Sequence, residues 1–380
     1  MTRYEGRKED PMTTTTEPDD ALLEPARLGG LVLPNRMVMA PMTRNRADAD
    51  GVPGSLMATY YAQRAAAGLI VAEAATPNAV GLTYPNIPAI YGPAHVAGWR
   101  NVTGAVRAAG GRMFLQIQHG GRIGHPDNSG LHPLAPSPIP LPDPIYTPSG
   151  FRPAVTPREM TLDDVHRTVA DFAAAARNAV DAGFEGVEVH SANGYLLHQY
   201  LSSATNRRTD AYGGPIENRI RFTVAVTRAV ADAIGPDRVG VRIAPGVTAN
   251  AMCEDDVDEL YPALVRALAE ISPAYLHVVY ADPDQDVFRA IRRLWPGTLI
   301  ANPKLPDVTT GHVLHESARL VAAGADLIAL GRPFLANPDL IERLRVGAPL
   351  NPIRDRHLMY TGDATGYIDY PTLETAAQPA

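Results

Sequence analysis

Cysteine and lysine are almost absent from this chain of 380 residues. The single cysteine, Cys253, excludes an internal disulfide, a zinc site built on CxxC pairs and a cysteine-ligated iron–sulfur cluster. The only lysines are Lys8 and Lys304, so Lys304 is the one candidate for an aldolase that forms a Schiff base at a strand's exit. His312 and His315 lie three apart on an expected helix without a third ligand, and we predict no metal site.

The chain also lacks a basic run and an apolar N-terminal segment. The net charge is −7 and the arginines are scattered, so we expect no nucleic-acid partner. Residues 1–20 are polar and charged, unlike a secretory signal or a membrane anchor, and we expect a flexible tail there, with Met12 as an alternative start. Together with the lone cysteine, these features favour a cytoplasmic protein that binds no membrane. We expect a monomer or a homodimer.

Short apolar runs rich in β-branched residues recur along the chain, each followed by a polar loop and a helical pattern. Eight such strands alternating with helices predict an α/β fold, a (β/α)₈ TIM barrel. We expect one barrel domain over residues 21–372 and a C-terminal tail over residues 373–380. The expected strands cover residues 36–40, 69–74, 112–118, 186–190, 239–244, 274–280, 298–302 and 326–331.

The helices between these strands carry recognisable start signals. Thr161 and Asp164 form a capping box ahead of a helix over residues 162–183. Pro215 precedes a second helix over residues 216–235. Both helices fall between expected strands, as the barrel requires.

Two segments interrupt the strand–helix alternation. Residues 28–35 predict a β-hairpin around a Gly-Gly pair, placed to cap the bottom of the barrel. Residues 120–158 are rich in proline, glycine and serine and follow the third strand as a long loop. Because loops on the carboxyl side of barrel strands carry active sites, we expect this loop to shape a substrate pocket or lid.

Polar side chains stand at the carboxyl ends of most of the expected strands. In barrel enzymes this rim carries the active site. One of them, Glu73, is expected to be an interior carboxylate paired with an arginine. The residues at the rim are Thr43, Glu73, Ala74, Gln116, His119, His190, Arg242, Gly331 and Arg332.

Residues 186–221 are the most informative segment of the rim. A strand ends at His190, and the turn that follows carries Asn193 and Tyr195. His190 and Asn193 can donate hydrogen bonds to a substrate oxygen, and the phenol of Tyr195 can deliver a proton to a neighbouring carbon. A lone histidine there would more often be a core residue, but the three residues at this spacing favour a catalytic group. The segment predicts reductive or acid–base chemistry on a carbonyl compound.

Other rim residues suit a flat, anionic heteroaromatic ligand. Gln116 offers an amide donor and an amide acceptor, and Arg242 can neutralise an electron-rich edge of such a ring. Gly331 and Arg332 follow the last strand, near which barrels often bind phosphate. These residues together predict a site for flavin mononucleotide (FMN).

Several longer stretches resemble the old yellow enzyme family of FMN-dependent ene-reductases, also described as NADH:flavin oxidoreductases. The resemblance runs from about residue 20 to about residue 372. The stretch 187–219 is the most specific of them. The matching stretches are LPNRMVMAPMTRNRA (33–47), FLQIQHGGR (114–122), VEVHSANGYLLHQYLSSATNRRTDAYGGPIENR (187–219), ALGRPFLANPDL (329–340) and, with Tyr360, GYIDYP (366–371).

The resemblance implies which residues bind FMN. Thr43 resembles the threonine that hydrogen-bonds the flavin O4, and Gln116 and Arg242 resemble the residues that bind the pyrimidine edge. The loop over residues 301–312 looks longer than the family's compact phosphate loop, so the backbone of Asn302 or the side chain of Lys304 would make that contact instead. The implied FMN ligands are Pro41, Met42, Thr43, Ala74, Gln116, Arg242, Asn302, Gly331 and Arg332.

The resemblance also implies the substrate site. His190 and Asn193 resemble the pair that holds the carbonyl oxygen of the substrate, and Tyr195 resembles the proton donor. Tyr360 lines the pocket. Gln118 also belongs to the expected substrate site, because it stands where the family usually has a tryptophan.

The implied reaction is the reduction of an α,β-unsaturated carbonyl compound by NADPH or NADH in two half-reactions. The nicotinamide reduces FMN and leaves, hydride then reaches the β-carbon of the substrate, and Tyr195 protonates the α-carbon from the other face. Reduction of nitro compounds or nitrate esters, and the reverse desaturation, remain alternatives on the same scaffold. The Schiff-base aldolase through Lys304 and a binding barrel without flavin are more remote alternatives.

Overall fold

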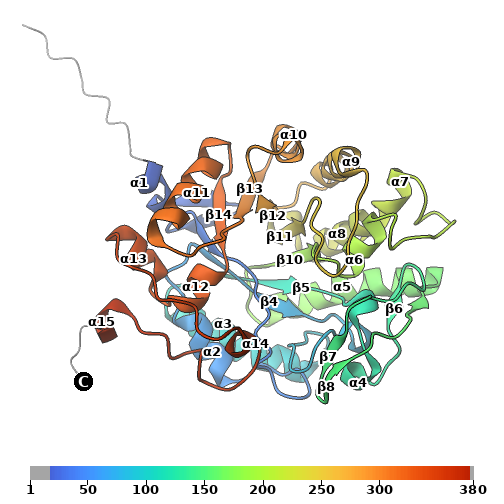
Figure 1. Ribbon diagram of the computed structural model, residues 1–380, viewed down its shortest axis with the longest axis horizontal. Helices are drawn as coiled ribbons and strands as arrows, with labels where there is room; N and C mark the ends of the chain where they lie inside the picture. Colours follow the sequence, from blue (N-terminus) through green and yellow to red (C-terminus); the bar gives the residue numbers. More distant parts are fainter. Residues whose placement is uncertain (1–17, 377–380) are drawn as a thin grey trace, which may run out of the picture.

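The computed structural model describes residues 18–376, which form a closed barrel of eight parallel strands (Figure 1). The predicted (β/α)₈ fold is confirmed, and every barrel strand overlaps one of the expected runs. The strands follow chain order around the barrel, and β14 closes it by pairing with β3. The barrel strands are β3 (Met37–Met39), β4 (Leu69–Ala75), β5 (Met113–Ile117), β10 (Gly186–Ser191), β11 (Val239–Ile243), β12 (Tyr275–Ala281), β13 (Thr298–Pro303) and β14 (Leu327–Leu330).

Helices cover the outside of the barrel (Figure 1). The capping box is confirmed, because Thr161 Oγ1 accepts from the Asp164 N–H while the Asp164 carboxylate accepts from the Thr161 N–H. The helix predicted after Pro215 forms as two segments, α7 and α8. The longer helices are α2 (Ser55–Ala62), α3 (Pro93–Ala108), α5 (Leu162–Asp181), α8 (Arg221–Ile234), α9 (Val257–Ala269), α10 (Asp286–Leu294) and α11 (Thr310–Ala322). The shorter ones include α1 (Pro18–Leu23), α4 (Pro126–Ser129), α6 (Leu196–Leu201), α7 (Ile216–Arg219), α12 (Arg332–Ala336), α13 (Leu340–Arg345), α14 (Arg356–Tyr360) and α15 (Leu373–Ala376).

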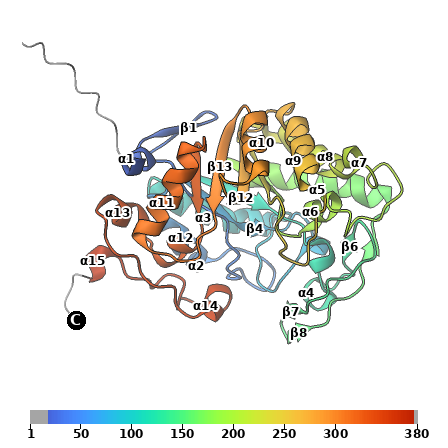
Figure 2. The ribbon, with the colours of Figure 1, turned by 45° about the horizontal axis from the view of Figure 1, so that its top comes forward.

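The predicted hairpin consists of β1 (Ala26–Leu28) and β2 (Leu31–Leu33), which pair antiparallel around Gly29 and Gly30. Its buried leucines join a separate apolar cluster with side chains from the lower barrel interior, among them Phe114. The hairpin therefore caps the bottom of the barrel, as expected. Figure 2 shows it on the side of the barrel opposite to α14.

The long loop after β5 contains short strands of its own. β6 (Leu134–Ala135) pairs with β9 (Arg158–Glu159), and β7 (Ile145–Thr147) pairs with β8 (Gly150–Arg152). In Figure 2, β7 and β8 lie on the same side of the barrel as α14. The loop therefore flanks the rim that carries the predicted site.

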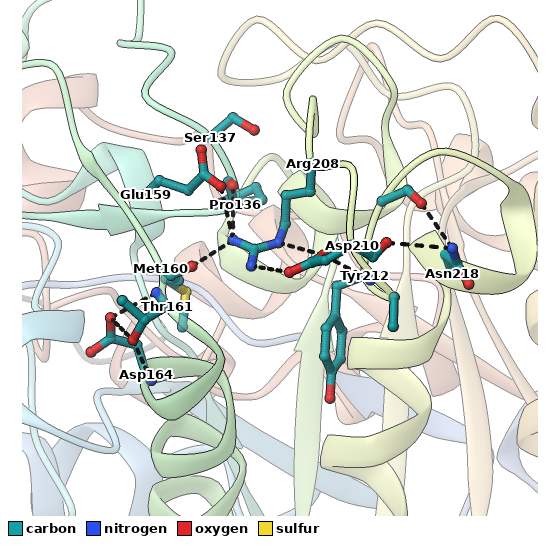
Figure 3. Close-up of polar contacts among 12 residues, drawn as sticks. Pro136, Ser137, Glu159, Met160, Thr161, Asp164, Arg208, Asp210, Tyr212 and Asn218 are labelled. Carbon is teal, nitrogen blue, oxygen red and sulfur yellow. Dashed lines mark hydrogen bonds and ion pairs between the residues drawn. The ribbon is translucent and has the colours of Figure 1, made fainter.

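Arg208 holds this loop against the loop that follows α6 (Figure 3). Its guanidinium donates to the backbone oxygens of Pro136 at 3.3 Å and Met160 at 2.6 Å, and it forms an ion pair with Asp210 at 2.5 Å. Arg208 is buried although it is charged, and these acceptors offset the cost of removing it from water. The later part of the informative 186–221 segment is thus structural.

The predicted tails fall partly outside the described residues. Residues 18–20 begin α1, and residues 373–376 form α15. Residues 1–17 and 377–380 lie outside the part that the structure describes. Over the described residues, no helix has both the length and the apolar character needed to cross a membrane.

Candidate active site

The barrel interior changes from apolar to polar along the strands. Because every second strand residue points inward, Phe114 of the apolar lower layer is followed by Gln116, and Ile300 is followed by Asn302. The same alternation places most of the predicted rim residues above the apolar layer. The inward polar set is Gln116, Gln118, Glu188, His190, Arg242, His277 and Asn302.

Arg242 connects three strands of the barrel. Its Nη2 donates to Asn302 Oδ1 at 2.9 Å on β13, and its Nη1 lies 3.5 Å from the backbone oxygen of Pro41 after β3. The buried Nε of Arg242 has no hydrogen-bond partner among the described residues. A charged donor left free at this depth fits a ligand with acceptor atoms on its edge, as the flavin pyrimidine has.

Gln116 lies beside Glu188 in the register of β5 and β10. Its Nε2 donates to Glu188 Oε1 at 2.8 Å. Both residues are buried, and Glu188 was not singled out from the sequence. Its strand position, two residues before His190, is the signal that would have placed it inside the barrel.

The loop after β3 carries Thr43, which is half-buried, and is joined to β4 by Glu73. The Glu73 carboxylate accepts from the backbone N–H of Arg44 at 3.0 Å and from the hydroxyl of Tyr61 at 3.2 Å. The expectation that Glu73 pairs with an arginine side chain is corrected. Arg44 contributes only its backbone N–H, and its guanidinium donates to the backbone oxygens of Met359 and Gly366. Burial raises the pKa of Glu73 to about 7.

The remaining predicted FMN ligands lie on the same rim. Met42 is half-buried beside Gly331, where an added Cβ would lie 3.3 Å from the Met42 sulfur. Ala74 is buried in β4. The backbone at Gly331 thus lies close to the Met42 side chain.

The residues predicted for the phosphate end lie on and beside the 301–312 loop. The Asn302 amide is engaged by Arg242 and by the backbone oxygen of Ala329 at 2.9 Å, so this side chain orients Arg242. Arg332 is exposed and donates to the backbone oxygen of Leu305 in the 301–312 loop. Lys304 is exposed on that loop.

His190 and Tyr195 are brought together, with ring centroids 5.2 Å apart. His190 is buried, stands opposite Arg242 in the sheet register, and its Nδ1 has no partner among the described residues. Burial, reinforced by the charge of Arg242, holds the pKa of His190 well below 6.5. The imidazole is therefore neutral near pH 7 and retains one N–H to donate.

The turn that carries Asn193 is left-handed, with φ of 55° at Asn193 and 79° at Gly194. Three side chains fix its backbone. Asn250 Nδ2 donates to the Asn193 oxygen at 2.7 Å, His198 Nδ1 accepts from the Gly194 N–H at 3.0 Å, and Gln199 Nε2 donates to the Gly194 oxygen at 2.7 Å. The backbone that carries the Asn193 side chain is thus fixed by two residues of α6 and by one residue of the loop after β11.

Tyr84 is a second residue that the sequence did not reveal. It lies in the loop after β4 and packs against the same small apolar cluster as Tyr195. Burial, together with the nearby hydroxyls of Tyr84 and Tyr360, raises the pKa of Tyr195 well above 10. The three phenols form one group at the rim, and an aromatic residue in a rim loop was the available signal for Tyr84.

Tyr360 lies on α14, which two arginines of the loop after β3 hold in place. Arg44 Nε donates to the backbone oxygen of Met359 at 2.8 Å, and Arg46 Nη2 donates to that of Thr361 at 2.6 Å. Tyr360 itself stands between these two anchors and is 46% exposed. The C-terminal segment is thereby attached to the loop that carries Thr43.

Gln118 is buried at the end of β5, where its Nε2 lies 3.5 Å from Thr83 Oγ1. It points inward with Gln116, as the alternation requires. Its small, polar side chain therefore occupies the position for which the family resemblance implies a larger aromatic one.

The sequence and the fold match known proteins over most of the chain. Residues 21–351 match the model of the NADH:flavin oxidoreductase / NADH oxidase family. A probable flavin mononucleotide-dependent alkene reductase of Leishmania infantum is 39% identical over 95% of this chain and 100% of the relative. The 12-oxophytodienoate reductase 1 of Oryza sativa subsp. japonica is 39% identical over 93% of each chain.

Two solved structures agree equally well in fold. An old yellow enzyme homologue from Zymomonas mobilis is 37% identical, with a TM-score of 0.87 over 93% of this chain and 100% of that one. Morphinone reductase in complex with tetrahydroNAD is 41% identical, with a TM-score of 0.87 over 95% of this chain and 99% of that one. The chain therefore belongs to the NADH:flavin oxidoreductase / NADH oxidase family and is an FMN-dependent ene-reductase of the old yellow enzyme type.

Proposed function

We propose that the protein uses NADPH or NADH to reduce the activated C=C bond of α,β-unsaturated carbonyl compounds in two half-reactions, with His190, Asn193 and Tyr195 as its catalytic residues. The carrying observation is the pairing of a neutral, buried His190 with Tyr195 at 5.2 Å between ring centroids. A hydrogen-bond donor for the carbonyl oxygen, His190, and a proton donor for the α-carbon, Tyr195, thus lie at the carboxyl end of β10.

His190 and Asn193 hold the substrate. A ring N–H of His190 and the amide of Asn193 donate to the carbonyl oxygen and stabilise the negative charge that develops there during reduction. Neutrality suits His190 to this role, because a neutral imidazole donates a hydrogen bond without losing its proton. The braced turn around Asn193 holds the second donor in place before substrate arrives.

Tyr195 supplies the proton. Its raised pKa keeps the phenol protonated across the physiological range, so a proton is available whenever the enolate forms. Tyr84 contacts Tyr195 and supports the orientation of its hydroxyl.

The proposed FMN ligands are those at the ends of β3, β4, β5, β11 and β14. When bound, FMN supplies the redox chemistry, because it can take up a hydride from a nicotinamide and pass it on to a substrate. Gln116 and Arg242 would hold the pyrimidine edge, and Thr43 would donate to its carbonyl. Gly331 and Arg332 would hold the phosphate, and the Asn302 side chain supports Arg242.

Substrate choice depends on Gln118 and Tyr360, which are proposed to line the pocket. Gln118 leaves more room than an aromatic side chain would, and its amide adds polarity. Both features favour larger or more polar enones than an aromatic wall would admit.

An absorption spectrum of the purified protein, followed anaerobically by NADPH and then by a cyclic enone, tests the proposal. We expect flavin bands that bleach with NADPH and return with the enone. Tyr195→Phe is expected to slow the reoxidation by enone much more than the reduction by NADPH. Equal slowing of both steps would contradict its role as proton donor, and a colourless protein that takes up no FMN would overturn the proposal.

A further inference from the structure

A buried carboxylate lies directly behind the residue proposed to bind the flavin pyrimidine. Glu188 is fully buried on β10 and accepts three hydrogen bonds. Gln116 Nε2 donates to Oε1 at 2.8 Å, while the hydroxyl of Tyr275 at 3.1 Å and Nδ1 of His277 at 2.8 Å both donate to Oε2. Each carboxylate oxygen therefore has a defined set of donors.

The sequence makes this arrangement possible through a glycine. Gly240 on β11 lies between Glu188 and Tyr275 in the register of the sheet. A Cβ at Gly240 would lie 2.0 Å from the Tyr275 ring, so only glycine lets this ring cross the strand and reach the carboxylate. β11 therefore has no side chain at the point where the Tyr275 ring passes it to reach Glu188.

Glu188 is ionised in this network. Burial alone would raise its pKa, but the hydrogen bonds from His277 and Gln116 and the charge of Arg242 outweigh burial and hold the pKa below its usual value. Burial lowers the pKa of His277, which we assign as a neutral imidazole that donates through Nδ1. An ionised carboxylate only accepts hydrogen bonds, so it can face only donors.

This restriction determines the orientation of the Gln116 amide. Since Glu188 accepts, the Nε2 end of Gln116 must point toward it, and the Oε1 end is left on the other side. We propose that Glu188 is a positioning residue for the cofactor, which turns the acceptor oxygen of Gln116 toward the ring and so selects a ring edge that carries an N–H. The isoalloxazine N3–H is such a donor between two carbonyl acceptors. This inference rests on the proposed role of Gln116 in FMN binding.

Substitution of Glu188 by glutamine is expected to reverse the amide of Gln116. In Glu188→Gln the new amide oxygen takes the hydrogen bonds of Tyr275 and His277, so the new NH₂ group faces Gln116. Gln116 must then turn its oxygen toward residue 188 and its own NH₂ group toward the ring. The donor of the ring edge loses its acceptor.

The test compares the dissociation constants of FMN and N3-methyl-FMN. Apoprotein is prepared from the purified holoenzyme by removal of its flavin, and the binding of each added flavin is followed by its fluorescence. Wild-type protein is expected to bind FMN at least about tenfold more tightly than the methylated analogue, the effect of one buried hydrogen bond. Glu188→Gln is expected to bind the two with similar affinity. Glu185→Gln, a carboxylate that accepts from the Met113 N–H at the start of β5, is the matched control and should discriminate like wild type.

A swap variant keeps the test open if Glu188→Gln alone fails to fold. In the double variant Gln116→Glu/Glu188→Gln the amide donates to the carboxylate in the opposite direction, and an acceptor oxygen again faces the ring. Discrimination against N3-methyl-FMN should return, and the midpoint potential of the flavin should rise in Glu188→Gln relative to the swap variant, because a buried negative charge has been removed. Two results would overturn the inference while leaving FMN binding intact. One is a Glu188→Gln protein that prefers FMN over N3-methyl-FMN as strongly as wild type and has the same midpoint potential as the swap variant. The other is a folded swap variant that binds the two flavins with equal affinity. A wild-type protein that binds neither flavin would overturn the proposed function and this inference with it.

Discussion

Asn250 and Asn193 face each other in left-handed turns with the same φ of 55°, and the side-chain amide of Asn250 donates to the backbone oxygen of Asn193 at 2.7 Å. The two turns follow neighbouring strands, β10 and β11. Asparagine tolerates this backbone region better than most residues, so both asparagines adopt it at little cost. The turn that presents Asn193, the proposed substrate ligand, is thus held by a residue of the next loop.

Replacement of Asn250 by alanine should therefore weaken substrate binding. Loss of one hydrogen bond of about 1 kcal/mol corresponds to a roughly fivefold rise in KM for a cyclic enone, with FMN content unchanged. Asn178→Ala is the control, since Asn178 makes a comparable 2.8 Å hydrogen bond to the backbone oxygen of Ile90 away from the rim. Steady-state kinetics on both variants distinguish the cases, and equal KM changes would contradict the bracing role.

The pH dependence of enone reduction should be flat between about pH 7 and pH 9.5. The pKa of His190 lies well below 6.5 and that of Tyr195 well above 10, so neither changes protonation in that interval. Single-turnover reoxidation of the reduced enzyme by enone checks this directly. A rate that falls with an apparent pKa near 8 would show that a different group delivers the proton.

Tyr84→Phe should slow the same reoxidation step by removing the hydroxyl that contacts Tyr195. A few-fold decrease is expected, because the proposed proton donor itself is retained and loses only a neighbouring hydroxyl that would orient it. Tyr146→Phe is the matched control, since Tyr146 packs against Phe151 in the hairpin of the long loop. The idea fails if both variants reoxidise at the wild-type rate.

Much of the fold could be predicted because its signals are local. Each barrel strand is a short apolar run followed by a polar loop, and a capping box marks the start of the 162–183 helix. The contact between Gln116 and Glu188 spans 72 residues and depends on strand register, which no local pattern encodes. Tyr84 was missed for the same reason, since it reaches Tyr195 from another loop.

Replacement of Arg208 should loosen the loop after β5. Arg208→Lys keeps the charge but cannot reach the oxygens of Pro136 and Met160 while pairing with Asp210. We expect a loss of about 2 kcal/mol and faster proteolytic cleavage within the loop after β5, with little change in FMN affinity. Arg207→Lys, at the exposed neighbouring position, should leave the cleavage rate unchanged. Cleavage at equal rates in both variants would show that Arg208 does not hold this loop.

Because the pKa of Glu73 is raised, replacement of Glu73 by glutamine should stabilise the protein more at pH 8 than at pH 4.5. Its folded-state pKa of about 7 lies above the ordinary value of 4.5, so the protonated form is the one that folding favours. The stability that Glu73 contributes is complete below about pH 4.5 and is lost as the pH rises through about 7, by roughly 3 kcal/mol in total. Glu73→Gln, which cannot ionise, should therefore gain about that much relative to wild type between pH 4.5 and pH 8.

Urea unfolding of both proteins, saturated with FMN and measured at several pH values, gives this difference in the free energy of unfolding. Glu342→Gln, in an exposed ion pair with Arg345 on α13, is the control and should differ from wild type by less than about 1 kcal/mol throughout. A Glu73→Gln protein whose stability relative to wild type is the same at pH 4.5 and pH 8 would show that the carboxylate is already ionised in the acidic range. In that case the hydrogen bonds from Arg44 and Tyr61, rather than burial, would dominate its ionisation.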